Sequence, residues 1–360
     1  MNATQPLPTR HSLMKYLSVC SGIEAATVAW HPLGWEAVAF AEVEKFPCAL
    51  LAHHYPYVPN LGDMTKINGE AFRGTVDLIV GGTPCQDFSV AGKRAGMAGE
   101  RGGLALAFVK LVSDVRPRWV VWENVPGVLS SGSGADFLRF LRLLADCGYC
   151  LAWRVLDAQY FGVPQRRRRV FVVGHLGDWR PAAQVLFEPH SLRRGIAPRG
   201  EARADVAGTL EGSLGRSLAK ACNAHGVRMD LDTETLIATA LRSDGHDASE
   251  DGTGRQNLVV GFAQNTRGEV RLQGGDGSIC GALGAEEGMK QRTYLMQKSA
   301  VRRLTPRECE RLQGFPDDYT LIPYRKKTAA DGPRYKALGN SMAVPVMRWI
   351  GERIELFGKG

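Results

Sequence analysis

Short apolar runs alternate with stretches of helical period over the first 180 residues. Six runs read as strands: YLSV (16–19), EAVAF (36–40), VDLIV (76–80), RWVVW (118–122), LAWRVL (151–156) and RVFVV (169–173). Four stretches between them have the spacing of amphipathic helices: 22–30, 44–55, 104–115 and 134–147. This alternation predicts an α/β fold in which helices flank a largely parallel sheet, and the near-continuous apolar strands predict that both sheet faces are buried.

The segment from about 181 to 300 has a different character. It holds 17 of the chain's 42 glycines but only three aromatic residues. So few large apolar side chains bury little surface, and we predict a second, smaller module rich in loops and strands. The predicted organisation is a first part over 1–180, this module over 181–300, and a C-terminal part over 301–360.

Regular patterning returns in the C-terminal part with two predicted helices. In LTPRECERLQGF, Thr305 suits an N-cap, Pro306 suits the first helical position and Glu308 completes a capping box. SMAVPVMRWIGERIELF (341–357) has amphipathic spacing, and Pro345 predicts an irregularity in the first turns of this helix.

The composition is ordinary for a soluble globular protein. Apolar residues make up 44% and charged residues 23% of the 360 positions. The first fifteen residues lack the apolar core of a signal peptide, and no apolar run approaches the length of a membrane span. Eight cysteines at irregular spacing indicate reduced thiols rather than a disulfide framework, so we expect a cytoplasmic protein.

The net charge of +8 favours a polyanionic partner. Basic and acidic residues number 19 and 15 in residues 1–180, 14 and 15 in 181–300, and 12 and 7 in 301–360. The excess positive charge therefore lies in the two outer parts of the chain and not in its middle.

A glycine turn follows the first predicted strand. VCSGIEAA opens the first helix around Gly22, so that backbone amides at a helix start can face a ligand. Glu42 ends the second strand 20 residues later, a distance at which an acidic residue can hold ribose hydroxyls, and Asp63 can contact a ribose or an adenine edge. A plain strand–turn–helix with surface acids is the alternative. A lysine does not follow the turn as in a Walker motif, which disfavours phosphate binding.

Cys85 and Glu123 each follow a predicted strand. Open α/β sheets bind ligands at the carboxyl edge of their strands, and both side chains should emerge at that edge. A lone cysteine is more often structural than nucleophilic, and Glu123 is alternatively a solvated loop residue. Their shared position favours function, because perturbed acids gather at strand ends in such sites.

Four consecutive arginines, 166–169, enter the last predicted strand of the first part. Such a run usually marks a solvated face. Strand alternation places Arg167 and Arg169 on one side and Arg166 and Arg168 on the other, so one pair can point into a site.

Two further motifs have the spacing of metal or redox sites, but we do not expect either to have that function. CGYC (147–150) has CxxC spacing but lies at a helix-to-strand junction without a second pair. His53 and His54 lack plausible metal partners nearby, and we interpret them as a helix-end feature.

The motifs together resemble the DNA cytosine-5 methyltransferases of bacteria and phages. The resemblance runs from VCSG near residue 19 to GNSMAVP near residue 345 and leaves the middle outside it. In the family's order and spacing the chain carries the cofactor loop, PCQ, ENV, QxRxR, LTPRECERLQGFP and YKALGNS.

This resemblance implies a Rossmann-like enzyme that takes a methyl group from S-adenosyl-L-methionine (SAM) and releases S-adenosyl-L-homocysteine (SAH). Cys85 would attack C6 of the target cytosine, and Glu123 would bind its N3 and exocyclic amine. Arg167 and Arg169 would hold the base and the catalytic loop. Positions implied to contact the cofactor are Cys20, Gly22, Ile23, Glu42, Val43, Asp63, Met64, Pro84, Leu104, Asn340 and Ser341. Positions implied to contact DNA are Gln86, Ser89, Lys93, Arg94, Arg101 and Gln165.

The same resemblance assigns roles to the three parts of the chain. Residues 1–180 would bind SAM and carry the catalytic groups, 181–300 would be the target recognition domain, and 301–360 would complete the catalytic domain. Two positions depart from the family: Cys20 stands where a phenylalanine usually stacks on adenine, and Glu24 replaces a glycine of the loop.

The chemistry explains the pattern. Addition of a thiolate to C6 makes C5 nucleophilic, and an acid at N3 shares a proton as charge builds on the ring. The base must leave the duplex for this reaction. The loop 86–104, with five glycines, is predicted to close over the flipped base, although a plain surface insertion is the alternative.

The leading hypothesis is thus a DNA cytosine-5 methyltransferase. This hypothesis assigns no metal-binding residues. A tRNA cytosine-5 methyltransferase and an inactive DNA-binding relative are the alternatives. The long middle segment favours duplex DNA, because sequence readout needs an element that enters a groove. Expected partners are double-stranded DNA and a cognate restriction endonuclease, with the protein itself a monomer.

Overall fold

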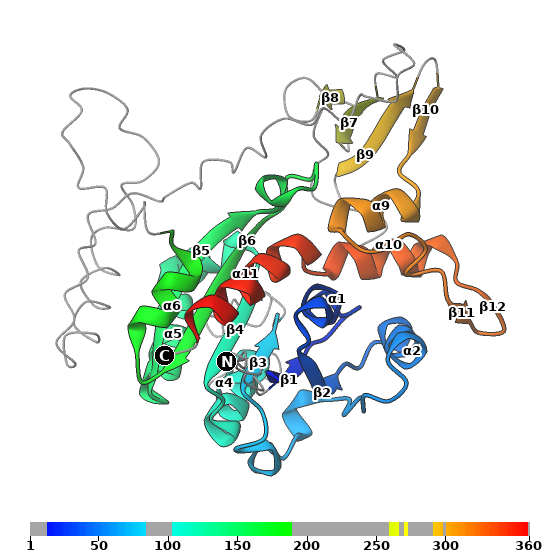
Figure 1. The fold of residues 1–360 in the computed structure, drawn as a ribbon. Coiled ribbons are helices and arrows are strands. Elements are labelled where there is room, and N and C mark those ends of the chain that lie inside the picture. Colours follow the sequence, from blue (N-terminus) through cyan, green and yellow to red (C-terminus); the bar gives the residue numbers. More distant parts are fainter. Residues whose placement is uncertain are drawn as a thin grey trace, which may run out of the picture.

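The computed structural model describes residues 13–83, 103–188, 259–265, 270–272, 291–297 and 300–358. A six-stranded sheet lies at its centre (Figure 1). Its strands are β1 (Lys15–Val19), β2 (Glu36–Ala41), β3 (Leu78–Gly81), β4 (Trp119–Asn124), β5 (Tyr149–Asp157) and β6 (Arg168–Leu176). All six predicted strands are therefore confirmed, in the spatial order β2-β1-β3-β4-β6-β5.

The sheet is largely parallel, as predicted. β1 pairs in parallel with β2 and β3, and β3 pairs in parallel with β4. β6 is antiparallel to both β4 and β5. The N-terminal end of β6 therefore lies at the edge where the parallel strands end, and this direction brings the arginine run to that edge.

Helices cover both faces of the sheet (Figure 1). The helices are α1 (Ala25–Trp30), α2 (Lys45–His54), α4 (Gly103–Val115), α5 (Ala135–Asp146), α6 (Trp179–Leu186), α9 (Pro306–Gln313), α10 (Asp331–Asn340) and α11 (Val344–Phe357). Short 3₁₀ turns are η1 (His31–Leu33), η2 (Met64–Lys66), η3 (Gly69–Phe72), η5 (Pro126–Gly134) and η6 (Ala158–Phe161). The four helices predicted between strands are confirmed. In the described part of the chain, none of these helices has the length and apolar character to cross a bilayer.

The apolar strands fill two cores because neighbouring residues point to opposite faces. Trp119 and Val121 belong to the core beneath α1, α6 and α11, whereas Val120 and Trp122 belong to the core beneath α4 and α5. All four side chains are completely buried. This is the two-sided burial that the near-continuous apolar strands predicted.

The helix α6 corrects the predicted boundary at residue 181. Ala182, Val185 and Leu186 are buried in the same core as the central sheet, and the helix packs on β5, β6 and α11. The first part of the chain therefore continues to the end of α6 at least.

The described strands of the middle segment form a separate antiparallel sheet. They are β7 (Val259–Asn265), β8 (Val270–Leu272), β9 (Gln291–Gln297) and β10 (Ala300–Arg303), in the order β10-β9-β7-β8. The final small hairpin is β11 (Pro323–Tyr324) with β12 (Lys327–Thr328). The middle segment is thus rich in strands where it is described, and its role in target recognition stays a prediction.

The C-terminal helices begin as the sequence dictates, with one correction. The Thr305 hydroxyl accepts from the Glu308 N–H and the Glu308 carboxylate accepts from the Thr305 N–H, which confirms the capping box. The predicted irregularity at Pro345 is wrong. α11 starts at Val344, so Pro345 lies in the first turn, where the missing N–H has no intrahelical partner to lose.

α11 returns to the start of the chain and packs on α1 (Figure 1). The Trp30 Nε1–H donates to the Met347 carbonyl at 2.7 Å. Gly351 faces the same ring, and a Cβ at that position would lie 2.5 Å from Trp30 Cδ1 and Nε1. The absence of a side chain at Gly351 therefore sets how closely the two helices approach.

Gly351→Ala should destabilise the protein. Alanine gains up to about 1 kcal/mol in helix propensity, but overpacking a buried contact costs about 1–3 kcal/mol. We expect a lower urea midpoint with an unchanged slope. Glu352→Ala, at an exposed position of the same helix, is the matched control. Equal stability of Gly351→Ala and the wild type would contradict the tight α1–α11 contact.

Candidate active site

The turn after β1 has an unusual backbone. Cys20, Gly22 and Glu24 all have left-handed φ values, of 49°, 57° and 61°. A Cβ added at Gly22 would meet no atom within 4 Å, so open space lies beside this residue. The turn thus presents backbone at the edge of the sheet, and two of its three left-handed residues adopt this conformation without the freedom of glycine.

Glu42 holds the turn from the end of β2. Its Oε2 accepts from the Gly22 N–H at 2.7 Å, and its Oε1 accepts from the N–H groups of Val43 and Glu44 at 2.8 and 2.7 Å. Gly22 and Glu42, both expected at the cofactor site, are thus in direct contact. A carboxylate has about four acceptor positions, so one remains for a ligand hydroxyl.

The other predicted cofactor residues surround this turn at different depths. Asp63 caps η2 by accepting from the Thr65 N–H and hydroxyl, and these hydrogen bonds lower its pKa. Met64 is buried, with its sulfur 4.0 Å from the Cys20 thiol. Val43 is 67% exposed. The Cys20 thiol, at the position that the resemblance assigns to a phenylalanine, thus lies against the Met64 sulfur.

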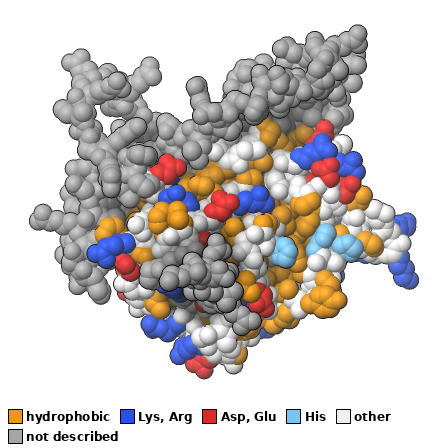
Figure 2. Space-filling model, viewed as in Figure 1, with side chains coloured by type: hydrophobic (Ala, Val, Ile, Leu, Met, Phe, Trp, Pro, Cys, Tyr) orange, Lys and Arg blue, Asp and Glu red, His pale blue; other side chains and the backbone are white. Residues whose placement is uncertain are grey.

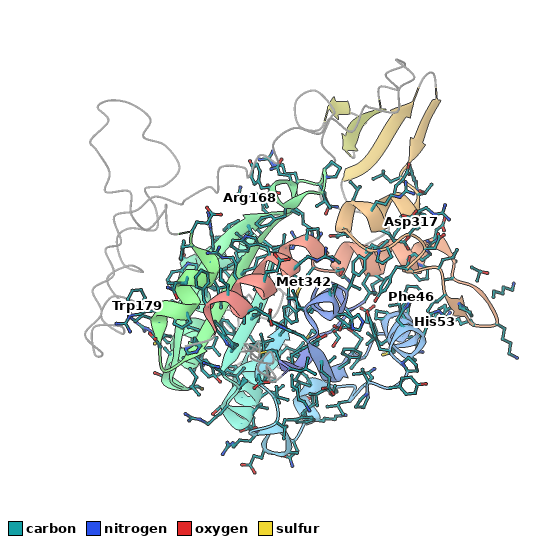
Figure 3. The ribbon with its side chains drawn as sticks, in the orientation of Figure 1. Phe46, His53, Arg168, Trp179, Asp317 and Met342 are labelled. Atoms are coloured by element: carbon teal, nitrogen blue, oxygen red, sulfur yellow. The ribbon has the colours of Figure 1, made fainter. Side chains whose placement is uncertain are left out.

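A narrow pocket joins four distant segments of the chain. Its walls come from the first turn, the end of β3, Glu123 and the link between α10 and α11. The lining residues are Ser18, Val19, Cys20, Ser21, Gly22, Glu24, Ala25, Ala26, Val80, Gly82, Glu123, Asn340, Ser341 and Met342. Met342, labelled in Figure 3, lies in that link. The pocket thus brings Cys20, Gly22, Glu123, Asn340 and Ser341 together, as the resemblance implied.

Gly82 permits this assembly. A Cβ on it would lie 3.0 Å from Glu123 Oε2 and 3.3 Å from Met342 Cε. The chain that leaves β3 toward Cys85 therefore passes in tight contact with Glu123. Cys85 itself lies outside the described residues, together with Pro84, Gln86, Ser89, Lys93, Arg94 and Arg101.

Glu123 ends β4 as a buried acid beside an arginine. It is 8% exposed, and its Oε1 lies 3.1 Å from Arg169 Nε. Burial raises the pKa of the Glu123 carboxyl, and the positive charges of Arg169 and Arg167 oppose the rise. Such a carboxyl can keep or share a proton near neutral pH, which an exposed glutamate rarely does.

The arginine run divides as strand alternation predicted. Arg167 is 2% exposed and Arg169 is half-buried, whereas Arg166 and Arg168 are exposed (Arg168 is labelled in Figure 3). Arg167 has a structural contact beside its implied role at the base and the catalytic loop, which stays a prediction. Its Nη2 donates to the carbonyls of Gly339 and Ser341 at 3.0 and 2.7 Å, which fixes the end of α10 to the sheet.

Gln165 is completely buried, and neither amide atom has a partner among the described residues. An unpaired buried amide costs about 1–3 kcal/mol. A direct contact of this side chain with DNA stays a prediction, and it requires the side chain to become exposed.

The remaining implied cofactor residues support the pocket from behind. Ile23 is completely buried, and Leu104 packs in the core that contains Met64. Neither lines the pocket.

Tyr319 is a site residue that sequence reasoning missed. Its hydroxyl donates to the Ile23 carbonyl at 2.9 Å and pairs with the Tyr55 hydroxyl at 3.1 Å, while its ring stacks on His54. The contact joins residues 296 positions apart, and spacing in a single sequence holds no signal for it. Tyr319 thus ties the C-terminal part to the cofactor turn.

The set-aside motifs have structural explanations. α2 ends at His54, whose Nε2 pairs with the Tyr319 carbonyl, so the helix-end interpretation is confirmed. Neither Cys147 nor Cys150 forms a disulfide in the described part of the chain. The described part of the chain contains no cluster of three His, Cys, Asp or Glu residues arranged to hold a metal.

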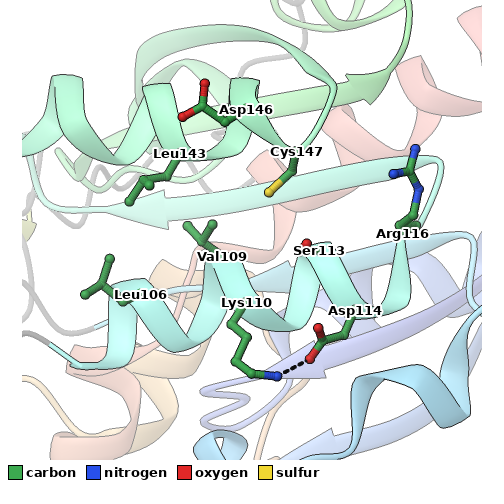
Figure 4. A pocket seen from close by; sticks show the side chains of 9 residues that line it. All are labelled: Leu106, Val109, Lys110, Ser113, Asp114, Arg116, Leu143, Asp146 and Cys147. Atoms are coloured by element: carbon green, nitrogen blue, oxygen red, sulfur yellow. Dashed lines mark hydrogen bonds and ion pairs between the residues drawn. The ribbon is translucent and has the colours of Figure 1, made fainter.

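An open groove of about 460 Å³ lies between α4 and α5 (Figure 4). Its walls include Val109, Leu143 and Cys147, with the Lys110–Asp114 ion pair on its rim. Val109, Lys110 and Asp114 lie in the second half of α4, Leu143 lies in the last turn of α5 and Cys147 follows it. Both helices run away from the carboxyl edge of the parallel strands. The groove is therefore separate from the pocket around Glu123.

The sequence model of the C-5 cytosine-specific DNA methylase family matches residues 14–356. The chain belongs to this family. The match spans both motif-bearing parts and the segment between them, so the family and the enzyme class predicted from the motifs are confirmed.

Several relatives align over nearly the whole chain. A protein of Escherichia phage P1 named DNA N-6-adenine-methyltransferase is 38% identical over 94% of this chain, which spans 61% of that relative's length. Type II methyltransferase M2.BsuMI of Bacillus subtilis is 28% identical over 95% of this chain and 75% of its own. Type II methyltransferase M.HpaII of Haemophilus parainfluenzae is 26% identical over 96% and 90%.

Solved structures share the fold. The S. pombe Dnmt2 methyltransferase superimposes with a TM-score of 0.58 at 17% identity, over 95% of this chain and 99% of that one. A putative DNA modification methyltransferase from an E. coli prophage gives 0.58 at 19% identity, over 96% and 100%. The predicted fold class is thereby confirmed.

Tyr319→Phe should loosen the cofactor turn. The change leaves the Ile23 carbonyl and the Tyr55 hydroxyl without their partner, at a cost of about 1–3 kcal/mol, while the stacked ring remains. We expect a lower free energy of unfolding in urea. Tyr57→Phe, at a side chain that is 97% exposed, should change nothing. Equal effects of the two substitutions would show that the Tyr319 hydroxyl does not hold the turn.

Proposed function

We propose that this protein transfers a methyl group from SAM to C5 of a cytosine flipped out of double-stranded DNA, through a covalent Cys85 adduct. The pocket carries this proposal. It places the buried Glu123–Arg169 pair, the glycine turn and Asn340–Ser341 around the exit of β3, and the next residues of the chain lead to Cys85.

The residues present fit the cofactor. Glu42 keeps one acceptor position for a ribose hydroxyl, the space beside Gly22 is open, and a buried carboxylate faces the pocket from Glu24. When bound, SAM supplies an activated methyl group. Cys20, Val43 and Met64 would contact its adenine through aliphatic and sulfur atoms in place of an aromatic ring.

Cys85 and Glu123 act at different atoms of the cytosine ring. The Cys85 thiolate adds to C6, and Glu123 hydrogen-bonds N3 and the exocyclic amine and shares a proton as charge develops. Arg169 orients the Glu123 carboxylate and holds the base. Arg167 acts at a distance, because it fixes the α10 end that carries Asn340 and Ser341. After C5 has taken the methyl group, a base, for which water suffices, removes the C5 proton, and the electron pair of that bond expels the thiolate from C6.

DNA contacts are proposed for the loop that follows Cys85. Lys93, Arg94 and Arg101 would meet phosphates, and Gln86 and Ser89 would approach the flipped base. On the face drawn in Figure 2, basic and acidic side chains of the described residues are interspersed rather than gathered. We therefore assign sequence readout to the middle segment, residues 181–300, and not to a basic patch on that face.

The cellular setting follows from the relatives. Several are named Type II methyltransferases, which suits a cognate restriction endonuclease in the same system. We propose a monomer that acts in the cytoplasm on double-stranded DNA.

Adenine N6 is the competing target, because the phage P1 relative carries that name. An exocyclic amine attacks a methyl donor without a covalent adduct, so that reaction would leave Cys85 and the buried Glu123–Arg169 pair unused. Mass spectrometry of digested nucleosides separates the alternatives. We expect 5-methylcytosine in DNA; N6-methyladenine, methylated tRNA alone, or no product with DNA bound would each overturn the proposal.

Cys85→Ala should abolish methyl transfer, with a loss of at least about 10³-fold, because the ring is no longer activated. DNA that contains 5-fluorocytosine should trap the wild type in a denaturant-resistant complex, since fluorine cannot leave as a proton. The variant should not be trapped. Cys147→Ala, which changes a free thiol at the α4–α5 groove, is the matched control. Methylation by Cys85→Ala would rule out the covalent route.

Glu123→Gln should slow transfer by about 10²–10⁴-fold, because an amide donates a hydrogen bond to N3 but cannot share its proton. Single-turnover rates and DNA affinity should be measured together. We expect the rate to fall while DNA affinity is retained. An unchanged rate would remove Glu123 from the chemistry.

A further inference from the structure

One carboxylate in the pocket wall has no cationic partner in the described part of the chain. Glu24 is 1% exposed and lines the pocket. Glu42 is bound by three backbone N–H groups and Glu123 by Arg169, but Glu24 forms no ion pair with a described side chain. It is therefore the acidic group of this site whose charge is least compensated.

The partners of Glu24 are hydroxyl and amide donors. Oε1 accepts from the Ser18 hydroxyl, and Oε2 accepts from the Thr27 hydroxyl at 2.6 Å and the Thr27 N–H at 3.3 Å. Since Thr27 spends its only hydroxyl proton on Glu24, the Tyr16 hydroxyl at 2.8 Å must donate to Thr27. This network orients the carboxylate rigidly but brings no opposite charge.

The position carries two energetic costs. A buried carboxylate without a counter-charge is unfavourable even after relaxation of the protein. The left-handed backbone of Glu24 is strained where glycine would not be. Burial also raises the pKa of the carboxyl. A cation delivered by a ligand would offset the first cost, and the pocket is open to one.

We propose that Glu24 supplies the counter-charge for the sulfonium centre of the methyl donor, an inference that rests on the function proposed above. The reacting methyl group must reach a cytosine held by Glu123, and Glu24 and Glu123 line the same narrow pocket. The sulfonium therefore belongs beside Glu24, whereas the ribose belongs beside Glu42.

Such a contact distinguishes substrate from product. As the bond from C5 to the methyl carbon forms, the sulfur–methyl bond breaks, and sulfur keeps its electron pair and becomes a neutral thioether. Glu24 then loses its partner. Because the positive charge disappears during transfer, the contact favours binding of SAM and release of SAH and does not lower the barrier itself.

Glu24→Gln tests this with binding alone. The amide keeps the size and the hydrogen-bonding reach but removes the charge. Calorimetry on the intact protein should show SAM binding weakened about tenfold and SAH binding changed less than about twofold. Glu42→Gln is the matched control. It should weaken SAM and SAH by the same factor, because both share the ribose.

The outcomes separate the two proposals. Equal losses for SAM and SAH in Glu24→Gln would overturn the sulfonium contact and leave the methyltransferase assignment standing. A wild type that binds neither molecule would overturn the proposed function. Where Glu24→Gln does not fold, sinefungin, in which a protonated amine replaces the sulfonium methyl group, is compared with SAH on the wild type. Tighter binding of the cationic analogue supports the contact, and equal or weaker binding overturns it.

Discussion

The site depends on the return of the C-terminal helices to the first strand–helix unit. Trp30 and Met347 join α1 to α11 in the core, and Tyr319 reaches the carbonyl of Ile23. Arg167 fixes the end of α10 from the far side of the pocket. Each contact joins parts of the chain that are distant in sequence. Without these contacts, the link that carries Asn340, Ser341 and Met342 would not be held against the glycine turn, and the pocket would lack one side.

Glu42, Glu123 and Glu24 surround the pocket, and each carboxylate has a different kind of partner. We infer a different role for each from this difference. Backbone amides hold Glu42 in place, which suits a rigid acceptor. Glu123 has a guanidinium beside it and a raised pKa, which suits a group that handles a proton. Hydroxyl groups hold Glu24, which forms no ion pair with any side chain that the structure describes. The same side-chain chemistry thus serves binding, proton sharing and charge recognition, according to its surroundings.

Much of the catalytic fold could be predicted from the sequence because its signals are local. Apolar runs marked all six strands, and Thr305 with Glu308 marked a helix start that needs only four neighbouring residues. Alternation along β6 correctly separated Arg167 from Arg168. The boundary at 181 failed because glycine content, which guided it, says nothing about the apolar face of α6.

Site residues that belong to the family motifs could be predicted from the sequence. Site residues whose role depends on long-range contacts in the fold could not. Glu123, Asn340 and Ser341 meet in one pocket as the motifs implied. The bonds of Arg167 to the α10 end join residues 172 and 174 positions apart, and the bond of Tyr319 to Ile23 joins residues 296 positions apart. A single sequence records no such pairing. Glu24 was visible as a departure from glycine, but only the structure shows that it is buried without an ion pair to a described side chain.

The contact between Trp30 and α11 also has a consequence for how the protein is made. α1 leaves the ribosome early, while its apolar partner face on α11 is synthesised more than 300 residues later. Until then, the Trp30 face of the nascent protein is exposed and prone to aggregate. The link that lines the pocket leads directly into α11, so the same segment covers the Trp30 face and completes the pocket wall. A chain that lacks this segment would expose apolar surface and have an incomplete site.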